Sequence, residues 1–225
     1  MKPEAFLFGT SADGLALTAW RWRSSQGPLL FVLGGVHGDE PEGAVAAHGL
    51  LRHFLENPPK DYSLVLLPVL NLDGALAQRR KNSRGVDLNR NMATKDWTSE
   101  VAKERYFPGT QPDSEPEVQA LVRFLEAEKP RFIVSLHSYK PMLNTNGDCV
   151  PEAEAASKLT GYTVTPTIGY PTPGCLGTWA GLERDMPTLT YEIEKGQAPD
   201  QVVKMHVPAV VAALETAAKR WRDRG

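Results

Sequence analysis

The sequence predicts an α/β fold in which a mixed, mainly parallel sheet is covered by helices on both faces, giving a three-layer sandwich. Two observations lead to this prediction. Continuous apolar runs such as Leu29–Leu33 are typical of strands buried on both faces, and they alternate with longer segments whose apolar residues recur at helical spacing. The length of 225 residues suits one hydrophobic core, so we expect a single domain over residues 1–225.

The first part of the chain contains three predicted strands and one predicted helix. Leu15–Trp22 alternates loosely between apolar and polar residues, and Leu29–Leu33 is an apolar run that ends in two glycines. Both are predicted strands. Glu42–Leu55 is a predicted helix because its apolar residues recur at helical spacing, and a Pro-Pro pair closes it. Tyr62–Leu70 is the next predicted buried strand.

The second part begins with a predicted capping box at Ser114–Glu117. In a capping box, the Ser114 hydroxyl accepts from the Glu117 amide while the Glu117 carboxylate reaches back, which predicts a helix running to about Glu128. In α/β sheets of the predicted kind, ligands bind beyond the carboxyl ends of the strands. The remaining predicted elements are a strand at Arg131–His137, a helix at Glu152–Leu159, a strand at Thr188–Ile193 and an amphipathic helix at Gln201–Arg222.

Composition and charge argue against several classes of function. The chain is 41% hydrophobic and 23% charged, as expected of a folded soluble protein. A net charge of -2 gives no general attraction for nucleic acid or an anionic membrane. No apolar run reaches the roughly 18 residues of a membrane span. The N-terminal stretch lacks the core of an export signal, and Cys149 and Cys175 are too few for a disulfide framework. We therefore expect free thiols and a cytoplasmic location.

A candidate metal site follows the strand Leu29–Leu33. His37 and Glu40 lie three residues apart on a glycine-rich turn, between this buried strand and the next helix. An imidazole nitrogen and a carboxylate oxygen so placed can bind Zn²⁺. An isolated pair of this kind is also common on solvated loops, so a third ligand is needed.

His137 is the candidate third ligand because it ends a core strand, at the edge of the sheet where a site is expected. A lone histidine at a strand end is more often a satisfied core residue. The competing histidines His48, His53 and His206 lie in helices and suit packing or solvent contact better. Three protein ligands with an open fourth position define a catalytic zinc site.

A catalytic zinc site also needs a base that moves the proton of the attacking water. Glu192 is the leading candidate, in the predicted strand Thr188–Ile193. Glu194 is its rival, because side chains alternate along a strand and the two glutamates share one face. Glu192 lies deeper in the apolar run and is preferred.

The segment Arg79–Asn91 is dense in guanidinium and amide groups. Arginine forks match carboxylates in a bidentate way, so this segment is a candidate for binding a substrate carboxylate. The alternatives are a solvated basic loop or contact with RNA, which the near-neutral chain disfavours. Asp87 lies inside the segment and could orient a ligand histidine.

Taken in order along the chain, these residues resemble the zinc carboxypeptidase family. His37 and Glu40 match its first two zinc ligands, and His137 in Ser-Leu-His-Ser-Tyr matches the third. The turn Asn71–Gly74 resembles the family's Asn-Pro-Asp-Gly turn, with Leu72 in place of the proline. The resemblance implies the α/β fold described above and one Zn²⁺ ion per chain.

The same resemblance implies roles for further residues. Arg80 would polarise the scissile carbonyl and stabilise its oxyanion, while Asn89 and Arg90 would grip the terminal carboxylate of a small peptide. Asp87 fits the partner of His37. Tyr170, in a Pro/Gly-rich loop, resembles the tyrosine that closes over substrate, although a plain core or surface tyrosine is the alternative. Glu192 then matches the family's general base.

Within the family, three motifs are most similar to a bacterial subgroup that cleaves the γ-D-glutamyl–meso-diaminopimelate bond of murein peptides released for recycling. They are Val36–Glu42, the Ser-Glu-Pro-Glu box and the Gly-Tyr-x-Thr-Pro-Gly loop. The resemblance therefore implies a peptide substrate with a free carboxylate. Gly177 lies where digestive relatives place a side chain that selects the substrate, so neither a hydrophobic nor a basic pocket is expected there.

Two alternatives remain open. Deacylases resembling succinylglutamate desuccinylase or aspartoacylase share the His-x-x-Glu, Asp-Leu-Asn-Arg and later His pattern, and they act on N-acyl amino acids. The Tyr170 loop, and the expectation of only a helix after Glu194, argue against them. A non-catalytic binding module on the same fold would have little reason to keep the ligands together with Arg80 and Glu192.

Overall fold

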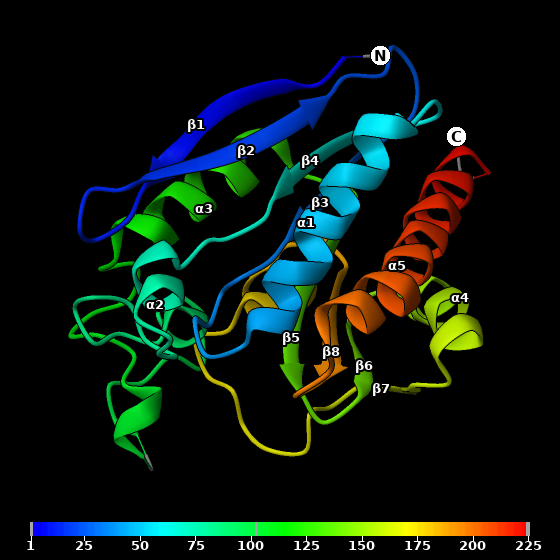
Figure 1. Ribbon diagram of the computed structural model, residues 1–225. Helices are drawn as coiled ribbons and strands as arrows, with labels where there is room; N and C mark the ends of the chain where they lie inside the picture. The colour runs from blue at the N-terminus through cyan, green and yellow to red at the C-terminus, as the bar shows by residue number, and fades with distance from the viewer. Residues whose placement is uncertain (1, 102, 224–225) are drawn as a thin grey trace.

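The computed structural model describes residues 2–101 and 103–223. An eight-stranded sheet in the order β1-β2-β4-β3-β5-β8-β6-β7 forms the middle layer (Figure 1). This arrangement confirms the predicted α/β class with a mixed sheet. The strands are β1 (Glu4–Thr10), β2 (Ala16–Trp22), β3 (Leu29–Leu33), β4 (Ser63–Leu67), β5 (Phe132–Tyr139), β6 (Met142–Asn146), β7 (Thr163–Thr165) and β8 (Thr188–Glu194).

Helices cover both faces of the sheet. On one face lie α1 (Pro41–Glu56), α4 (Val150–Thr160) and α5 (Pro199–Arg222), and on the other lies α3 (Pro116–Glu128) (Figure 1). Among the described residues, no helix is long and apolar enough to cross a membrane. The shorter elements are α2 (Leu72–Leu76), the 3-10 turns η1 (Leu88–Arg90) and η2 (Glu104–Tyr106), and the π-helical turn η3 (Gly177–Leu182).

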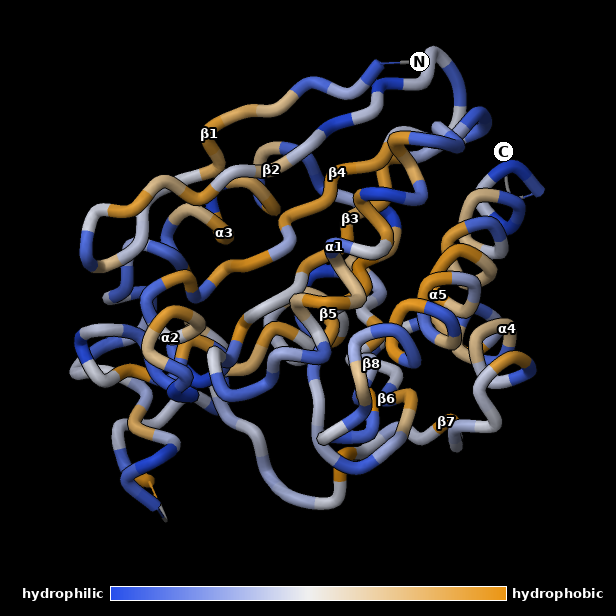
Figure 2. Tube along the Cα trace, viewed as in Figure 1, coloured by the Kyte–Doolittle hydropathy of each residue, from blue (hydrophilic) through white to orange (hydrophobic). Residues whose placement is uncertain are grey.

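The central strands are apolar throughout because each face packs against its own hydrophobic core. Along β3, Leu30 and Val32 pack into the core beneath α1 and α5, while Phe31 and Leu33 pack into the core beneath α3. Figure 2 shows β3 and β4 as continuous hydrophobic segments. This pattern explains why the central strands could be recognised from the sequence.

The predicted site lies at a topological switch point of the sheet, where the connections from neighbouring strands lead in opposite directions. From β3 the chain passes through α1 to β4 on one side, whereas β5, on the other side of β3, comes from a much later part of the chain. Because β3 and β5 are parallel, their carboxyl ends open into one crevice, the usual ligand position in such sheets. Strand β8 continues the parallel run beside β5.

Helix α1 begins unusually close to β5. A Cβ atom on Gly43, in its first turn, would lie 2.5 Å from the main-chain oxygen of Leu136. Only glycine allows this approach of one main chain to another. The first turn of α1, which follows His37 and Glu40, is therefore held directly against the residue before His137.

Some local predictions were wrong. Strands β1, β6 and β7 lie outside every predicted element. The capping box is absent, because α3 begins after Glu115 without a side-chain cap. The Ser114 hydroxyl donates to Glu115, and the Glu117 carboxylate accepts instead from the amide of Ala12 and from the side chain of Asn82. These contacts tie α3 to distant parts of the chain.

His206 in α5 makes the stability of the fold dependent on pH. Its ring is buried, with Nδ1 2.8 Å from the Tyr191 hydroxyl and Nε2 3.0 Å from Oε1 of Gln197. Burial lowers the pKa of His206 to about 4. Since the unfolded chain takes up this proton near pH 6.5 and the folded chain does not, the stability associated with neutral His206 is present above pH 6.5. It is lost as the pH falls toward 4.

We therefore expect the His206→Gln variant to lose about 1 to 2 kcal/mol less of its free energy of unfolding between pH 7 and pH 4.5 than the unchanged protein. Urea denaturation at a series of pH values measures this difference. Parallel pH profiles for the two proteins would contradict the assignment, whatever their relative stability at pH 7.

Candidate active site

His37 and Glu40 lie on the turn that joins β3 to α1. Glu40 is the residue before the first helical turn, its amide lies 3.3 Å from the His37 carbonyl oxygen, and Pro41 starts the helix. The turn is compact because a Cβ on Gly38 would lie 2.0 Å from the main chain of Gly74. Both side chains are buried at the carboxyl end of β3.

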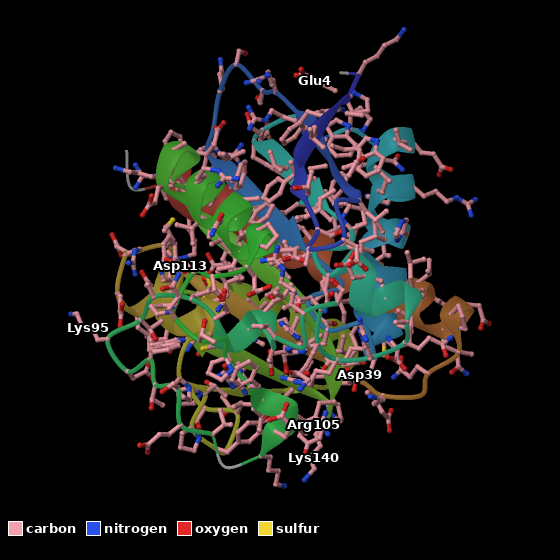
Figure 3. The ribbon with its side chains drawn as sticks, turned by 90° about the vertical axis from the view of Figure 1, so that its left-hand side faces the viewer. Glu4, Asp39, Lys95, Arg105, Asp113 and Lys140 are labelled. Atoms are coloured by element: carbon pink, nitrogen blue, oxygen red, sulfur yellow. The ribbon has the colours of Figure 1, made fainter. Side chains whose placement is uncertain are left out.

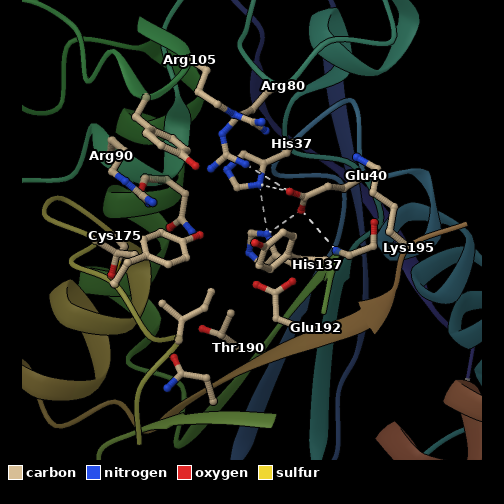
Figure 4. A pocket seen from close by; sticks show the side chains of 18 of the residues that line it. His37, Glu40, Arg80, Arg90, Arg105, His137, Cys175, Thr190, Glu192 and Lys195 are labelled. Carbon is tan, nitrogen blue, oxygen red and sulfur yellow. Dashed lines mark hydrogen bonds and ion pairs between the residues drawn. The ribbon is translucent and has the colours of Figure 1, made fainter. Parts of the chain in front are cut away.

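His137 reaches the same point from β5, so the structure brings the three predicted metal ligands together. Nδ1 of His37 lies 2.9 Å from Oε1 of Glu40, and Nδ1 of His137 lies 3.0 Å from Oε2 of Glu40. The two Nδ1 atoms are 3.2 Å apart. Figure 4 shows the three side chains converging in the pocket.

The far nitrogen of each imidazole has its own partner. Nε2 of His37 lies 3.1 Å from Oδ1 of Asp87, and Nε2 of His137 lies 3.0 Å from the hydroxyl of Ser135. When each Nε2–H donates to its partner, each Nδ1 carries a lone pair. Two lone pairs and the carboxylate of Glu40 then face one point, where only a cation or a proton satisfies them.

A divalent zinc ion fits this donor set. Two imidazole nitrogens and one carboxylate are the ligands of a catalytic zinc site, and tetrahedral zinc separates its ligand atoms by about 3.3 Å. The measured separations between these atoms are 2.9 to 3.2 Å. The candidate ligand atoms of His37, Glu40 and His137 all lie within 4.8 Å of one another.

Asp87 connects the candidate ligands to Arg80. Its Oδ2 accepts from Nε of Arg80 at 2.8 Å, and Nη1 of Arg80 lies 3.2 Å from Oε1 of Glu40. Burial alone would raise the pKa of Asp87, but the charge of Arg80 and the hydrogen bond with His37 outweigh it and lower the pKa. Asp87 therefore stays ionised, holds the His37 ring and positions the Arg80 guanidinium at the edge of the candidate metal centre.

Glu192 lies beside His137 because β8 pairs with β5 in a register that places these two residues opposite each other. Glu192 is 5% exposed, and its Oε2 atom has no hydrogen-bond partner among the residues that the structure describes. Burial raises the pKa of Glu192 to about 7, and the charge of Glu40 acts in the same direction. The rival Glu194 shares this face but is exposed at the end of the strand. The structure thus provides one buried carboxylate with a free oxygen next to the candidate ligands.

Asn89, Arg90 and Tyr170 line the same cavity, which has a volume of about 330 Å³. Oδ1 of Asn89 accepts from the amide of Leu176, and Nη1 of Arg90 lies 2.6 Å from the Asn89 carbonyl oxygen. Tyr170 is 38% exposed. It stacks against Tyr106 with 6.5 Å between ring centroids.

The cavity also has walls that the sequence analysis missed. Tyr106 lies under both arginines, with its ring centroid 5.2 Å from the Arg80 guanidinium and 5.4 Å from that of Arg90. Gly177 does not line the cavity, because it lies against Asn146; a Cβ there would be 2.3 Å from the Asn146 side-chain oxygen. The other missed lining residues include Lys103, Arg105, Asn144, Asn146, Thr190 and Lys195.

The amide-lined wall comes from the strand β6. It pairs antiparallel with β8 and places Asn144 opposite Thr190 and Met142 opposite Glu192. The alternation in Met-Leu-Asn-Thr-Asn is the only sequence signal that could have indicated this wall. The basic residues Lys103 and Arg105 lie in or beside η2, an irregular segment with no periodic signal.

Comparison with known proteins agrees with this geometry. Residues 4–168 match the family model described as zinc carboxypeptidase. The chain is 27% identical to murein peptide amidase A of Vibrio campbellii over 220 residues, which cover 92% of this chain and 86% of the relative. It is 30% identical to murein peptide amidase A of Escherichia coli K12 over 164 residues, covering 66% of this chain and 64% of the relative.

Solved structures show the same fold. The crystal structure of a murein-tripeptide amidase from Escherichia coli O157 superposes with a TM-score of 0.79 at 24% identity, covering 95% of this chain and 93% of that one. Bovine thrombin-activatable fibrinolysis inhibitor, bound to a tick carboxypeptidase inhibitor, superposes with a TM-score of 0.83 at 21% identity, covering 100% and 92%. Because the family model spans well over half of the sequence and the three candidate ligands meet at one point, the chain belongs to the zinc carboxypeptidase family of metallopeptidases.

Proposed function

We propose that this protein uses one Zn²⁺ ion to hydrolyse the amide bond next to the C-terminal residue of a small peptide, and that the bond is γ-D-glutamyl–meso-diaminopimelate in murein peptides. The observation that carries the peptidase assignment is the position of Glu192. Glu192 lines the cavity beside the convergent His37, Glu40 and His137, and its buried Oε2 atom has no hydrogen-bond partner among the described residues. The murein substrate is supported by the similarity to murein peptide amidase A over 92% of the chain.

In the proposed mechanism, His37, Glu40 and His137 hold the zinc ion. A bound zinc ion acidifies water and polarises a carbonyl group. Glu192 accepts the proton of the attacking water and delivers it to the nitrogen of the leaving amine. Burial of Glu192 raises its pKa above the usual range of a carboxylic acid, which favours uptake of a proton that is later delivered to the amine.

Arg80, Asn89, Arg90 and Tyr170 position the substrate in this proposal. The Arg80 guanidinium, fixed by Asp87, donates to the oxyanion that develops on the scissile carbonyl. Asn89 and Arg90 bind the terminal carboxylate at the other end of the cavity, and Tyr170 closes over it. When Tyr170 covers the bound substrate, water is excluded, and the interactions of Arg80 and Arg90 with the substrate become stronger.

One assay separates this proposal from deacylation of N-acyl amino acids. The zinc-loaded protein is incubated with L-Ala-γ-D-Glu-meso-diaminopimelate and, separately, with an N-succinyl amino acid, and released amines are identified by mass. We expect free meso-diaminopimelate from the first substrate. Cleavage of the N-succinyl amino acid alone would assign the protein to the deacylases instead.

A further inference from the structure

The cavity carries more positive charge than one terminal carboxylate requires. Its cationic lining residues are Arg80, Arg90, Lys103, Arg105 and Lys195. Arg80 is paired with Asp87 and Glu40 and is assigned above to the oxyanion, and Arg90 is assigned to the terminal carboxylate. The remaining three cations have no role in the proposed mechanism. A further substrate carboxylate, beyond the one assigned to Arg90, would give them one.

Asp39 gathers two of these cations at the mouth of the cavity. Its Oδ2 atom lies 3.7 Å from Nη2 of Arg105 and 3.9 Å from Nζ of Lys195. Both separations exceed the about 2.7 to 2.9 Å of a tight charge-assisted hydrogen bond, so donors on both side chains stay available. The two cationic side chains are 54% and 50% exposed. One carboxylate facing two cations leaves this group one positive charge in excess.

The position of this group relative to the metal centre indicates which part of a substrate it meets. Asp39 lies in the chain between His37 and Glu40. Figure 4 shows Lys195 across the His37–Glu40–His137 cluster from Arg90, with Arg105 near Arg80 above the cluster. A peptide whose terminal carboxylate is bound at Arg90 and whose scissile carbonyl lies at the cluster must extend its acyl part toward Lys195 and Arg105.

We propose that Arg105 and Lys195, positioned by Asp39, bind a free carboxylate on the acyl side of the scissile bond, and that this group is the α-carboxylate of the γ-linked D-glutamyl residue. This inference rests on the proposed function. The main chain of an ordinary α-linked peptide presents only neutral amide groups there. A γ-glutamyl residue keeps its α-carboxylate because the peptide bond is formed through its side chain. The two cations therefore favour γ-linked substrates over α-linked peptides that carry a neutral side chain at this position.

The test compares two tripeptides that differ only in this carboxylate. One is L-Ala-γ-D-Glu-meso-diaminopimelate, and in the other the D-glutamyl α-carboxylate is converted to a carboxamide. The zinc-loaded protein is expected to prefer the acid by about tenfold in kcat/KM, mainly through a lower KM, as loss of a partly exposed charge-assisted contact predicts. In the double variant R105Q/K195Q this preference should fall below about twofold, because cleavage of the acid falls much more than cleavage of the carboxamide.

Matched variants separate charge from structure. R105K keeps the charge and should keep most of the preference. K140Q removes an exposed lysine that does not line the cavity, and it should leave the preference unchanged; Figure 3 shows Asp39, Arg105 and Lys140 on the same side of the molecule. If the double variant does not fold, the single variants R105Q and K195Q provide the test. Each should reduce the preference for the acid over the carboxamide by about threefold.

Each outcome gives a decision. A wild-type protein that cleaves acid and carboxamide equally well overturns this inference and leaves the proposed function standing. A double variant that slows both substrates equally also overturns it, because that pattern indicates a structural role. Failure of the zinc-loaded protein to cleave either tripeptide overturns the proposed function, and this inference with it.

Discussion

Replacing Glu192 with glutamine is expected to reduce kcat by about 10³-fold while leaving zinc content unchanged. The amide keeps the shape of the side chain but cannot take up the proton of the attacking water. Because Glu192 is opposite His137 in the sheet register and is not one of the converging ligands, the metal site should survive. Steady-state kinetics on the murein tripeptide, with elemental analysis of the same sample, measure both effects.

Glu194 provides the matched control. It lies two residues further along β8 on the same face but is exposed, so E194Q should change kcat by less than about twofold. A large loss in E194Q, or substantial activity in E192Q, would transfer the role of general base away from Glu192. A loss of zinc in E192Q would instead make this residue part of the metal site.

The second large effect is expected from the candidate metal ligand His137. The H137A variant should lose bound zinc and at least about 10³-fold in activity, because zinc contributes several kcal/mol to catalysis in such sites. In the unchanged protein, a chelator should abolish activity and added zinc should restore it. Zinc at about 100 times its Kd should also stabilise the folded protein by about 2.7 kcal/mol, raising the Tm.

Neither zinc-dependent effect should be seen in H137A. The exposed histidine His48 in α1 supplies the control, since H48A should keep both zinc and activity. An H137A variant that still binds zinc stoichiometrically, or a chelated protein that remains fully active, would contradict the assignment of His37, Glu40 and His137 as the metal centre.

The central fold and the convergence of the three candidate ligands could be predicted because their signals are local and periodic. Strand β3 is an uninterrupted apolar run that ends four residues before His37, and β5 is largely apolar up to Leu136, directly before His137. Parallel neighbours open at the same edge of the sheet, so His37, Glu40 and His137 were expected near one another. Alternation along β8 left Glu192 and Glu194 on one face, and the deeper position of Glu192 in the apolar run made it the preferred candidate.

What could not be predicted depends on contacts between distant segments. Strands β1 and β7 lie at the edges of the sheet, and their short or half-exposed sequences carry no buried pattern. The capping box failed because Glu117 finds partners more than 30 residues away in sequence, Ala12 and Asn82. Arg105 and Lys195 come from distant segments, and each forms an ion pair with Asp39. Their spacing along the chain therefore could not have indicated that they lie together.

The close seating of Gly43 on Leu136 has a consequence for engineering this scaffold. The first turn of α1 packs directly against the Leu136 carbonyl oxygen of β5. Main-chain atoms therefore determine the relative positions of the candidate metal ligands. Cavity walls supplied by η2 and β6 contribute none of the three candidate ligands. Libraries that randomise Lys103, Arg105, Asn144 and Asn146 should therefore retain metallation and change substrate choice, whereas any side chain introduced at position 43 should erode both together.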